Sequence, residues 1–144
     1  MNIYQKCIDA ELNAGNLYET ALDKFRDDPR AQLLCANLEV IKEDHRAAVV
    51  DLSAMITADD STPRESEHIW QVLQANLRDS ANLQGERSAV SLLAKAESYC
   101  QRVLQKLEAR ADIPEPVKDL VAGRLLPSID AHTSVLSQAV VLTE

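Results

Sequence analysis

Apolar residues recur every three or four positions along most of the chain, which is the spacing of a helix that buries one face. A first stripe, at about 3–26, contains Ile3, Cys7, Ala10, Ala14, Leu17 and Ala21. A second stripe, at about 30–57, contains Leu34, Leu38, Ile41, His45, Ala48, Leu52 and Met55. The pattern therefore predicts two long helices in the first part of the chain.

Two further stripes occupy the second part of the chain. One, at about 87–110, contains Val90, Leu93, Glu97, Cys100, Leu104 and Leu107. The other, at about 115–142, contains Val121, Leu125, Ile129, His132, Leu136 and Ala139. Pro127 lies inside the last stripe, and because proline lacks the N–H of a regular α-helix, we expect a kink about one turn before His132.

Start and stop signals separate these segments. Asn2 is placed to cap the first helix, and the Asp-Pro pair at 28–29 is placed to start the second. A third start signal, Thr-Pro-Arg-Glu at 62–65, predicts a shorter helix at about 63–78. Polar residues and one glycine then predict a break at about 79–86.

The lengths of the connections predict the architecture. Short connections make each pair of long helices an antiparallel hairpin, whereas the middle connection is long enough to cross the length of a bundle. We predict one all-α domain over residues 1–144. Its hairpins should lie at 1–57 and 87–144, joined by a crossover at 58–86 that contains the short helix. Two hairpins joined in this way form a ferritin-like four-helix bundle.

Composition supports this prediction and argues against several functions. The 144 residues include three glycines and five prolines, and 46% of them are hydrophobic but only 3% aromatic. The net charge of −8 argues against nucleic-acid binding, because basic side chains are needed to neutralise phosphates. No apolar run approaches the roughly 20 residues of a membrane span. Because the N-terminus also lacks a signal-peptide pattern, we expect a cytoplasmic protein.

One ionisable residue interrupts the apolar pattern of each long helix. In chain order these residues are Glu11, His45, Glu97 and His132. Nearly equal numbers of residues separate each glutamate from the next histidine, so each pair should lie at one height in its hairpin. The hairpins also resemble each other, since DHRAAVVDL at 44–52 parallels AHTSVLSQA at 131–139. We therefore expect the four side chains to meet inside the bundle.

A buried cluster of this kind has two interpretations, because an isolated buried charge is costly. The first is a metal centre, since carboxylate and imidazole ligands suit iron, manganese or zinc. The second is a metal-free centre in which each histidine is hydrogen-bonded to a glutamate. In that case the protein would be a non-enzymatic structural or interaction module.

Alternating Glu and His on successive helices resembles the di-iron carboxylate proteins of the ferritin and rubrerythrin kind. More closely, the chain is similar to a bacterial ferritin-like family of unknown function. That family has an acidic and aromatic first helix, a tryptophan in the crossover, an acidic third helix and a buried histidine in the fourth. The matching segments are DAELNAGNLYETAL at 9–22, Trp70, LLAKAESYCQRVL at 92–104 and LLPSIDAHTSVL at 125–136. The resemblance covers nearly the whole chain and implies the same fold.

One departure from the ferritin pattern limits the chemistry that the resemblance implies. Ferritin-type centres carry Glu-x-x-His on the second and fourth helices, and those glutamates bridge two metals. Here Lys42 and Ile129 occupy the positions three residues before the two histidines. We therefore expect a single metal ion, iron or another divalent metal, or none, rather than a di-iron ferroxidase. Any activity would be oxygen or peroxide chemistry, and a homodimer is the expected assembly.

Residues beside these candidates have simpler interpretations. Asp44 directly precedes His45, whereas Glu43 and Asp130 each lie two residues before a histidine. Their side chains point 100° or more away from the histidines and should be solvated, although Asp130 could contact a metal ligand. Tyr4 and Tyr18 flank Glu11 on the first helix and are expected to be core residues.

Three other kinds of residue are expected to have structural roles. Trp70 should anchor the crossover helix on the bundle, and His68 should lie on the surface. The widely separated Cys7, Cys35 and Cys100 lie on or beside apolar stripes, and we expect buried structural thiols there.

Overall fold

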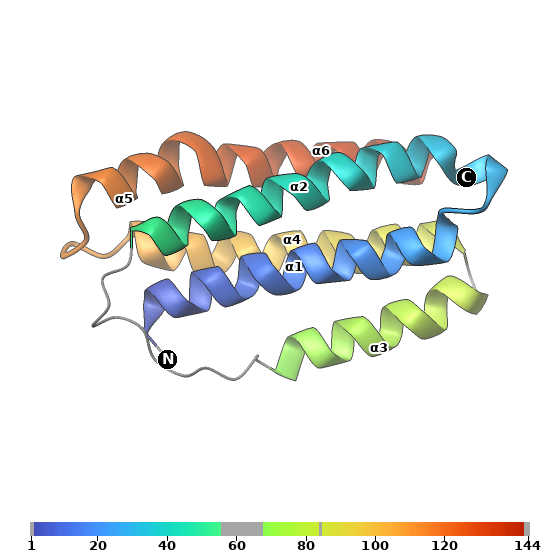
Figure 1. Ribbon diagram of the computed structural model, residues 1–144, viewed down its shortest axis with the longest axis horizontal. Coiled ribbons are helices and arrows are strands. Elements are labelled where there is room, and N and C mark those ends of the chain that lie inside the picture. The colour runs from blue at the N-terminus through green and yellow to red at the C-terminus, as the bar shows by residue number, and fades with distance from the viewer. Residues whose placement is uncertain (1, 56–67, 84, 143–144) are drawn as a thin grey trace.

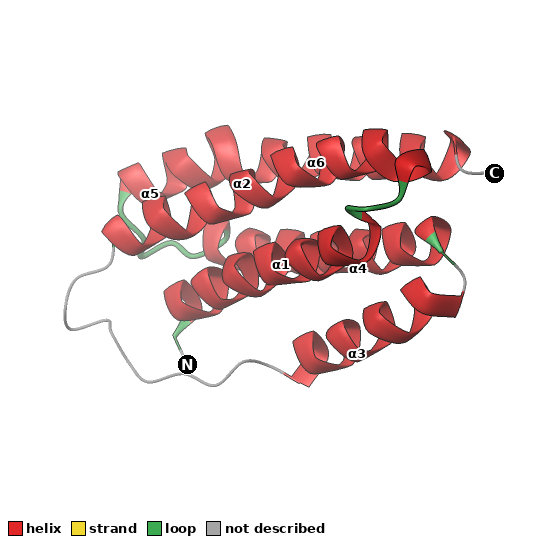
Figure 2. Cartoon of the chain, turned by 45° about the vertical axis from the view of Figure 1, so that its right-hand side comes forward, coloured by secondary structure: helices red, strands yellow, loops and turns green. Residues whose placement is uncertain are grey.

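The computed structural model describes residues 2–55, 68–83 and 85–142, and every regular element in those ranges is helical (Figures 1 and 2). The long helices are α1 (Ile3–Phe25), α2 (Gln32–Ala54), α3 (His68–Leu83), α4 (Glu86–Glu108) and α6 (Leu126–Leu142). The shorter elements are η1 (Pro29–Ala31), α5 (Glu115–Leu120) and the π-helical turn η3 (Val121–Leu125). The prediction of an all-α protein is confirmed.

The predicted capping residues form hydrogen bonds at the N-termini of the first two helical segments. The Asn2 side chain accepts a hydrogen bond of 2.9 Å from the backbone N–H of Gln5, as its position predicts. The Asp28 side chain accepts one from the backbone N–H of Arg30, but the turn that it starts is η1. Helix α2 therefore begins at Gln32, slightly later than the sequence predicts.

The break before α4 is much shorter than the predicted 79–86. Helix α3 continues to Leu83, because the polar residues at 78–82 include neither glycine nor proline and a helix tolerates them. Gly85 adopts a positive φ of 75°, which is favourable only for glycine, and α4 begins directly after it. The predicted helix start at 62–65 lies outside the described residues.

A widened turn interrupts the last helical segment. At its end the backbone N–H of Leu126 donates to the carbonyl of Val121, five residues earlier, instead of four. Pro127 follows directly, and it has no N–H with which to continue a regular helix. The distortion predicted at this proline is therefore a π-helical turn.

The long helices lie side by side along the molecule. In Figure 1, α2 and α4 run in one direction, whereas α1, α3 and α6 run in the opposite one. Helix α1 packs on α2 and α4, and α6 packs on α4 and α2 (Figure 2). Helix α3 lies outside this group against α1 and α4, so α2 and α6 share a face that it does not cover.

Trp70 attaches α3 to the rest of the protein. Its side chain is 2% exposed and meets the ring of Tyr99 edge-on, with the ring centroids 5.3 Å apart. The predicted anchor is confirmed, and His68 is exposed as expected. Cys7 and Cys100 are buried free thiols, whereas Cys35 is only partly buried.

Among the described residues, no helix combines the length and the apolar character that crossing a membrane requires.

The Trp70 anchor can be tested by two substitutions. Among the described residues the indole Nε1 has no hydrogen-bond partner, so Trp70→Phe should cost little, whereas Trp70→Ala should lower the free energy of unfolding by about 3–5 kcal/mol. Urea denaturation of both variants measures the difference. Equal losses for phenylalanine and alanine would show that packing of the ring is not what holds α3.

Candidate functional site

The four residues that interrupt the apolar stripes converge in the interior. Glu11 comes from α1, His45 from α2, Glu97 from α4 and His132 from α6, and all four are buried. Each occupies a position of its helix at which the pattern otherwise places an apolar residue, so folding the apolar faces together necessarily buries the polar groups. The predicted meeting of these side chains is confirmed.

The side chains are joined directly by hydrogen bonds. His45 Nδ1 lies 2.5 Å from a Glu11 carboxylate oxygen, and His45 Nε2 lies 2.7 Å from Glu97 Oε2. The other oxygen of Glu97, Oε1, lies 2.9 Å from His132 Nδ1. Glu97 thus bridges the two imidazoles, whose ring centroids are 5.0 Å apart.

Asp44 extends this arrangement to the surface, contrary to the expectation that it is merely solvated. One of its carboxylate oxygens lies 2.8 Å from His132 Nε2, while 47% of its side chain stays exposed. The apolar pattern of α2 indicates only its face toward the core. A residue about 100° around a helix can face a second neighbour, which for Asp44 is α6. Asp130 instead accepts a hydrogen bond from Gln101 and is exposed.

Five groups therefore alternate between acid and imidazole, and we call them the acid–imidazole chain. In order from the surface inward they are Asp44, His132, Glu97, His45 and Glu11. Every ring nitrogen in it faces a carboxylate oxygen. With both imidazoles protonated, the five groups of the acid–imidazole chain carry a net charge of −1. With both imidazoles neutral, they carry −3.

Tyr18 is a core residue, as the sequence predicts, and it also belongs to the site. Its hydroxyl donates to Glu97 Oε2 at 2.7 Å, and its ring stacks on that of His45 at 5.6 Å between centroids. Tyr18 is seven residues from Glu11 on α1, so both project from one face of the helix. That spacing was the available signal for its role.

Lys42 is not part of the centre, although it lies three residues before His45. Its Nζ is turned toward Glu19, at 2.9 Å, and Glu39, at 2.7 Å. The ammonium group therefore does not occupy the place of a bridging carboxylate.

The electrostatics favour protonated imidazoles. Burial alone lowers the pKa of His45, but the carboxylates of Glu11 and Glu97 outweigh it and raise the pKa to about 10. For Glu97, burial raises the pKa, whereas the charge of His45 and hydrogen bonds from both imidazoles lower it to about 2. Burial likewise lowers the pKa of His132, and its contacts with Glu97 reverse the direction. In the absence of metal, His45 is therefore an imidazolium ion at neutral pH, and the pKa of His132 is shifted in the same direction.

Two groups of ligand atoms lie close enough to hold one metal ion. His45, Glu97 and His132 form the first, with ligand atoms within 4.8 Å of one another, and Glu11, His45 and Cys100 form the second. Burial raises the pKa of the Cys100 thiol well above its usual value, so the thiolate needed for metal binding is disfavoured in the second group. The first group is the better candidate.

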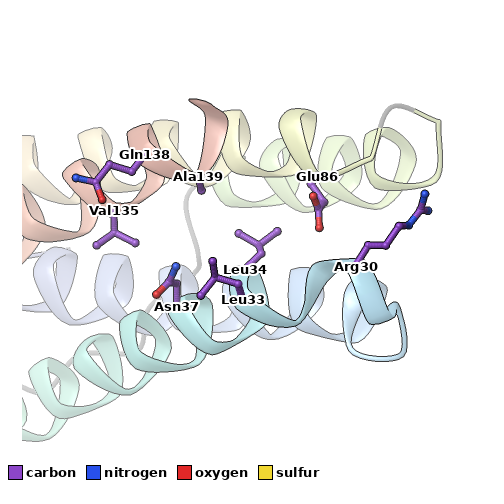
Figure 3. Close-up of a pocket in the computed structure, with 8 residues that line it drawn as sticks. All are labelled: Arg30, Leu33, Leu34, Asn37, Glu86, Val135, Gln138 and Ala139. Atoms are coloured by element: carbon purple, nitrogen blue, oxygen red, sulfur yellow. The ribbon is translucent and has the colours of Figure 1, made fainter. Parts of the chain in front are cut away.

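A cavity of about 10 Å³ adjoins the acid–imidazole chain. It is lined by Glu11, Asp44, His45, Ala48, Leu125, Ser128, Ile129 and His132. The volume suits a single water molecule. Two larger cavities, of about 330 and 520 Å³, lie elsewhere, and none of the five groups lines them. Figure 3 shows the first of these, between α2 and the end of α6.

Neither a protein-family model nor a curated protein nor a solved structure matches the chain. Its function must therefore be inferred from its own residues.

The raised pKa of His45 predicts how stability depends on pH. A histidine whose pKa rises on folding stabilises the folded state below its unfolded pKa, and this contribution is lost as pH rises through the folded pKa. For the metal-free protein, the free energy of unfolding should therefore fall between about pH 6.5 and 10. His45 contributes up to about 1.4 kcal/mol per pH unit to this slope.

Urea denaturation across this pH range tests the prediction. His45→Asn should give a shallower slope, while His68→Asn, which changes an exposed histidine, should follow the wild type. Parallel slopes for all three proteins would contradict the assignment.

Proposed function

We propose that the protein is a ferritin-like helical bundle whose buried Glu and His side chains bind a single divalent metal ion, with iron the expected metal. The topology supports this proposal. Because α2 and α4 run in the same direction, α3 returns the chain along the molecule between them, as a crossover helix does in ferritin-like bundles (Figure 1). Each of the four remaining long helices contributes one side chain to the centre.

The observation that carries the proposal is the position of Glu97. Its side chain is completely buried, and its two oxygens contact different imidazoles. When each imidazole loses the proton that makes it positive, the acid–imidazole chain holds three carboxylates with no positive charge among them, and two of these, Glu11 and Glu97, are buried. Uncompensated buried charge is strongly unfavourable, so a divalent cation is a natural replacement for the two protons.

The donor set also fits the proposed metal. Carboxylate oxygens and neutral imidazole nitrogens are ligands of iron, manganese and zinc. His45, Glu97 and His132 would form the ligand set. Glu11, which contacts the other ring nitrogen of His45, would orient that imidazole. The adjoining cavity has room for a water molecule beside them. Bound iron supplies oxygen or peroxide chemistry where a coordination position stays open.

The centre does not have the ligands of a di-iron ferroxidase. The bridging glutamates of such enzymes are replaced by Lys42 and Ile129, and Lys42 is engaged with acidic residues at the surface. One metal ion is the simplest occupant of the centre.

A second candidate is a metal-free polar centre in a structural or interaction protein. The observation in its favour is that both nitrogens of each imidazole already have carboxylate partners. Protons on these nitrogens therefore satisfy the hydrogen bonds of the acid–imidazole chain without a metal ion. In this case the centre would specify how the helices pack.

Elemental analysis after expression with added iron distinguishes the candidates. A metal centre predicts about one equivalent of metal per chain in the wild type. His132→Gln and Glu97→Gln should each retain less than about a tenth of that. Asp130→Asn is the matched control, because it changes an exposed acid adjacent on α6 and should bind normally. Metal-free wild-type protein would exclude the first candidate.

Thermal unfolding provides a second readout. A ligand that binds only the folded state stabilises it by about 2.7 kcal/mol when its free concentration is 100 times Kd. Chelation should therefore lower Tm, and the effect should grow with pH because binding displaces protons. An unchanged Tm together with absent metal would favour the metal-free centre.

A further inference from the structure

Large exposed apolar side chains gather on the outer face of α2. Among the described residues, the three most exposed ones are Leu33, Val40 and Val50, at 65%, 63% and 66%. The next is Leu12 on α1, at 42%. Scattered exposed apolar residues are ordinary, but three on one face of one helix indicate a surface that another molecule covers.

These residues belong to a regular seam. The outer α2 stripe consists of Leu33, Ala36, Val40, Glu43, Ala47, Val50 and Ala54, all exposed. Its steps alternate between three and four residues, which is the heptad spacing of a helix that packs lengthwise against another helix. The inner face of α2 already packs on the core through a separate stripe. Helix α2 therefore carries two seams, and one of them faces outward.

We propose that the outer α2 stripe pairs with the same stripe of a second copy of this chain, antiparallel, about a twofold axis near residues 43 and 44. The sizes of the side chains support this arrangement. Leu33 would meet Ala54 of the second copy, and Val40 would meet Ala47. In the same register Val50 would lie within one residue of Ala36. Each large side chain is thus opposite a small one, which lets the two helices approach closely along the stripe.

Charges beside the stripe support the same direction. Glu39 and Arg46 flank it on one side, and both side chains are about half exposed, at 48% and 58%. Antiparallel pairing places Glu39 beside Arg46 of the second copy, and the twofold axis repeats this contact. Glu43, the one charged member of the stripe, is 3.3 Å from Arg46 of its own chain. The two Glu43–Arg46 pairs would therefore lie together near the axis with no net charge.

Other directions and occupants fit less well. A parallel pair would set Leu33 against Leu33 and Val40 against Val40, leaving the alanines opposite one another across a gap. A lipid surface is disfavoured because acidic residues surround the stripe and the whole chain has a net charge of −8. Helices that bind membrane surfaces carry basic residues on their polar face, where anionic headgroups attract them.

The mass of the protein in solution tests the proposal. Sedimentation equilibrium of the wild type should show the mass of a dimer when the protein concentration reaches roughly 100 µM. The double variant Val40→Glu with Val50→Glu should dissociate at least tenfold more readily. Val72→Glu is the matched control, since Val72 is an exposed valine on α3 and the change should leave the dimer intact. Circular dichroism checks that each variant is folded.

Cysteine cross-linking tests the direction without introducing buried charge. In a Cys35→Ser background, Val40→Cys protein mixed with Ala47→Cys protein should form an inter-chain disulfide on mild oxidation. Val40→Cys alone should cross-link poorly, because its two copies would be displaced by about 10 Å along the helices, beyond the reach of a disulfide. A monomeric wild type, a dimer that survives both glutamates, or preferential cross-linking of Val40→Cys to itself would overturn the proposal.

Discussion

The contact on which the interior depends is that of one carboxylate, Glu97, with two imidazoles and a phenol. Its oxygens accept from Tyr18 and lie within hydrogen-bond distance of His45 and His132, so α1, α2, α4 and α6 meet at a single side chain. A buried charge with several partners costs little while all are present and much when one is removed. The relative positions of these helices along their axes are therefore fixed by polar contacts that apolar packing alone would not specify.

Protons and a metal ion would compete for the same atoms in this centre. Carboxylates raise the pKa of His45, which stabilises the protonated form and makes a metal ion displace tightly held protons. In the proposed metal-bound state, the same carboxylates would supply the negative charge that attracts a cation once the protons leave. The affinity for metal should thus depend on pH as much as on the identity of the ligands. This dependence is expected wherever the ligands of a metal are hydrogen-bonded to each other in its absence.

The periodic features of the sequence predicted most of the fold. Spacing of apolar residues located the long helices, and the same spacing identified Glu11, His45, Glu97 and His132 as exceptions that had to meet. Asp44 was missed because periodicity describes the face toward the common core, whereas Asp44 faces only one neighbouring helix. The pattern indicates only a core position for Tyr18, because a buried phenol resembles an apolar side chain until its partner is known. The extent of α3 was underestimated, since polar residues at 78–82 do not distinguish a solvated helix from a loop.

The π-helical turn before Pro127 has a consequence for how the last segment meets the core. Val117, Val121, Leu125 and Ile129 are all buried, yet they are spaced four residues apart. In a regular α-helix three such steps would rotate the last residue about 120° past the first. One wide turn absorbs much of that excess. A single extra residue therefore keeps both ends of the segment in phase, so that Val117 seals the end of the core while His132 still reaches Glu97.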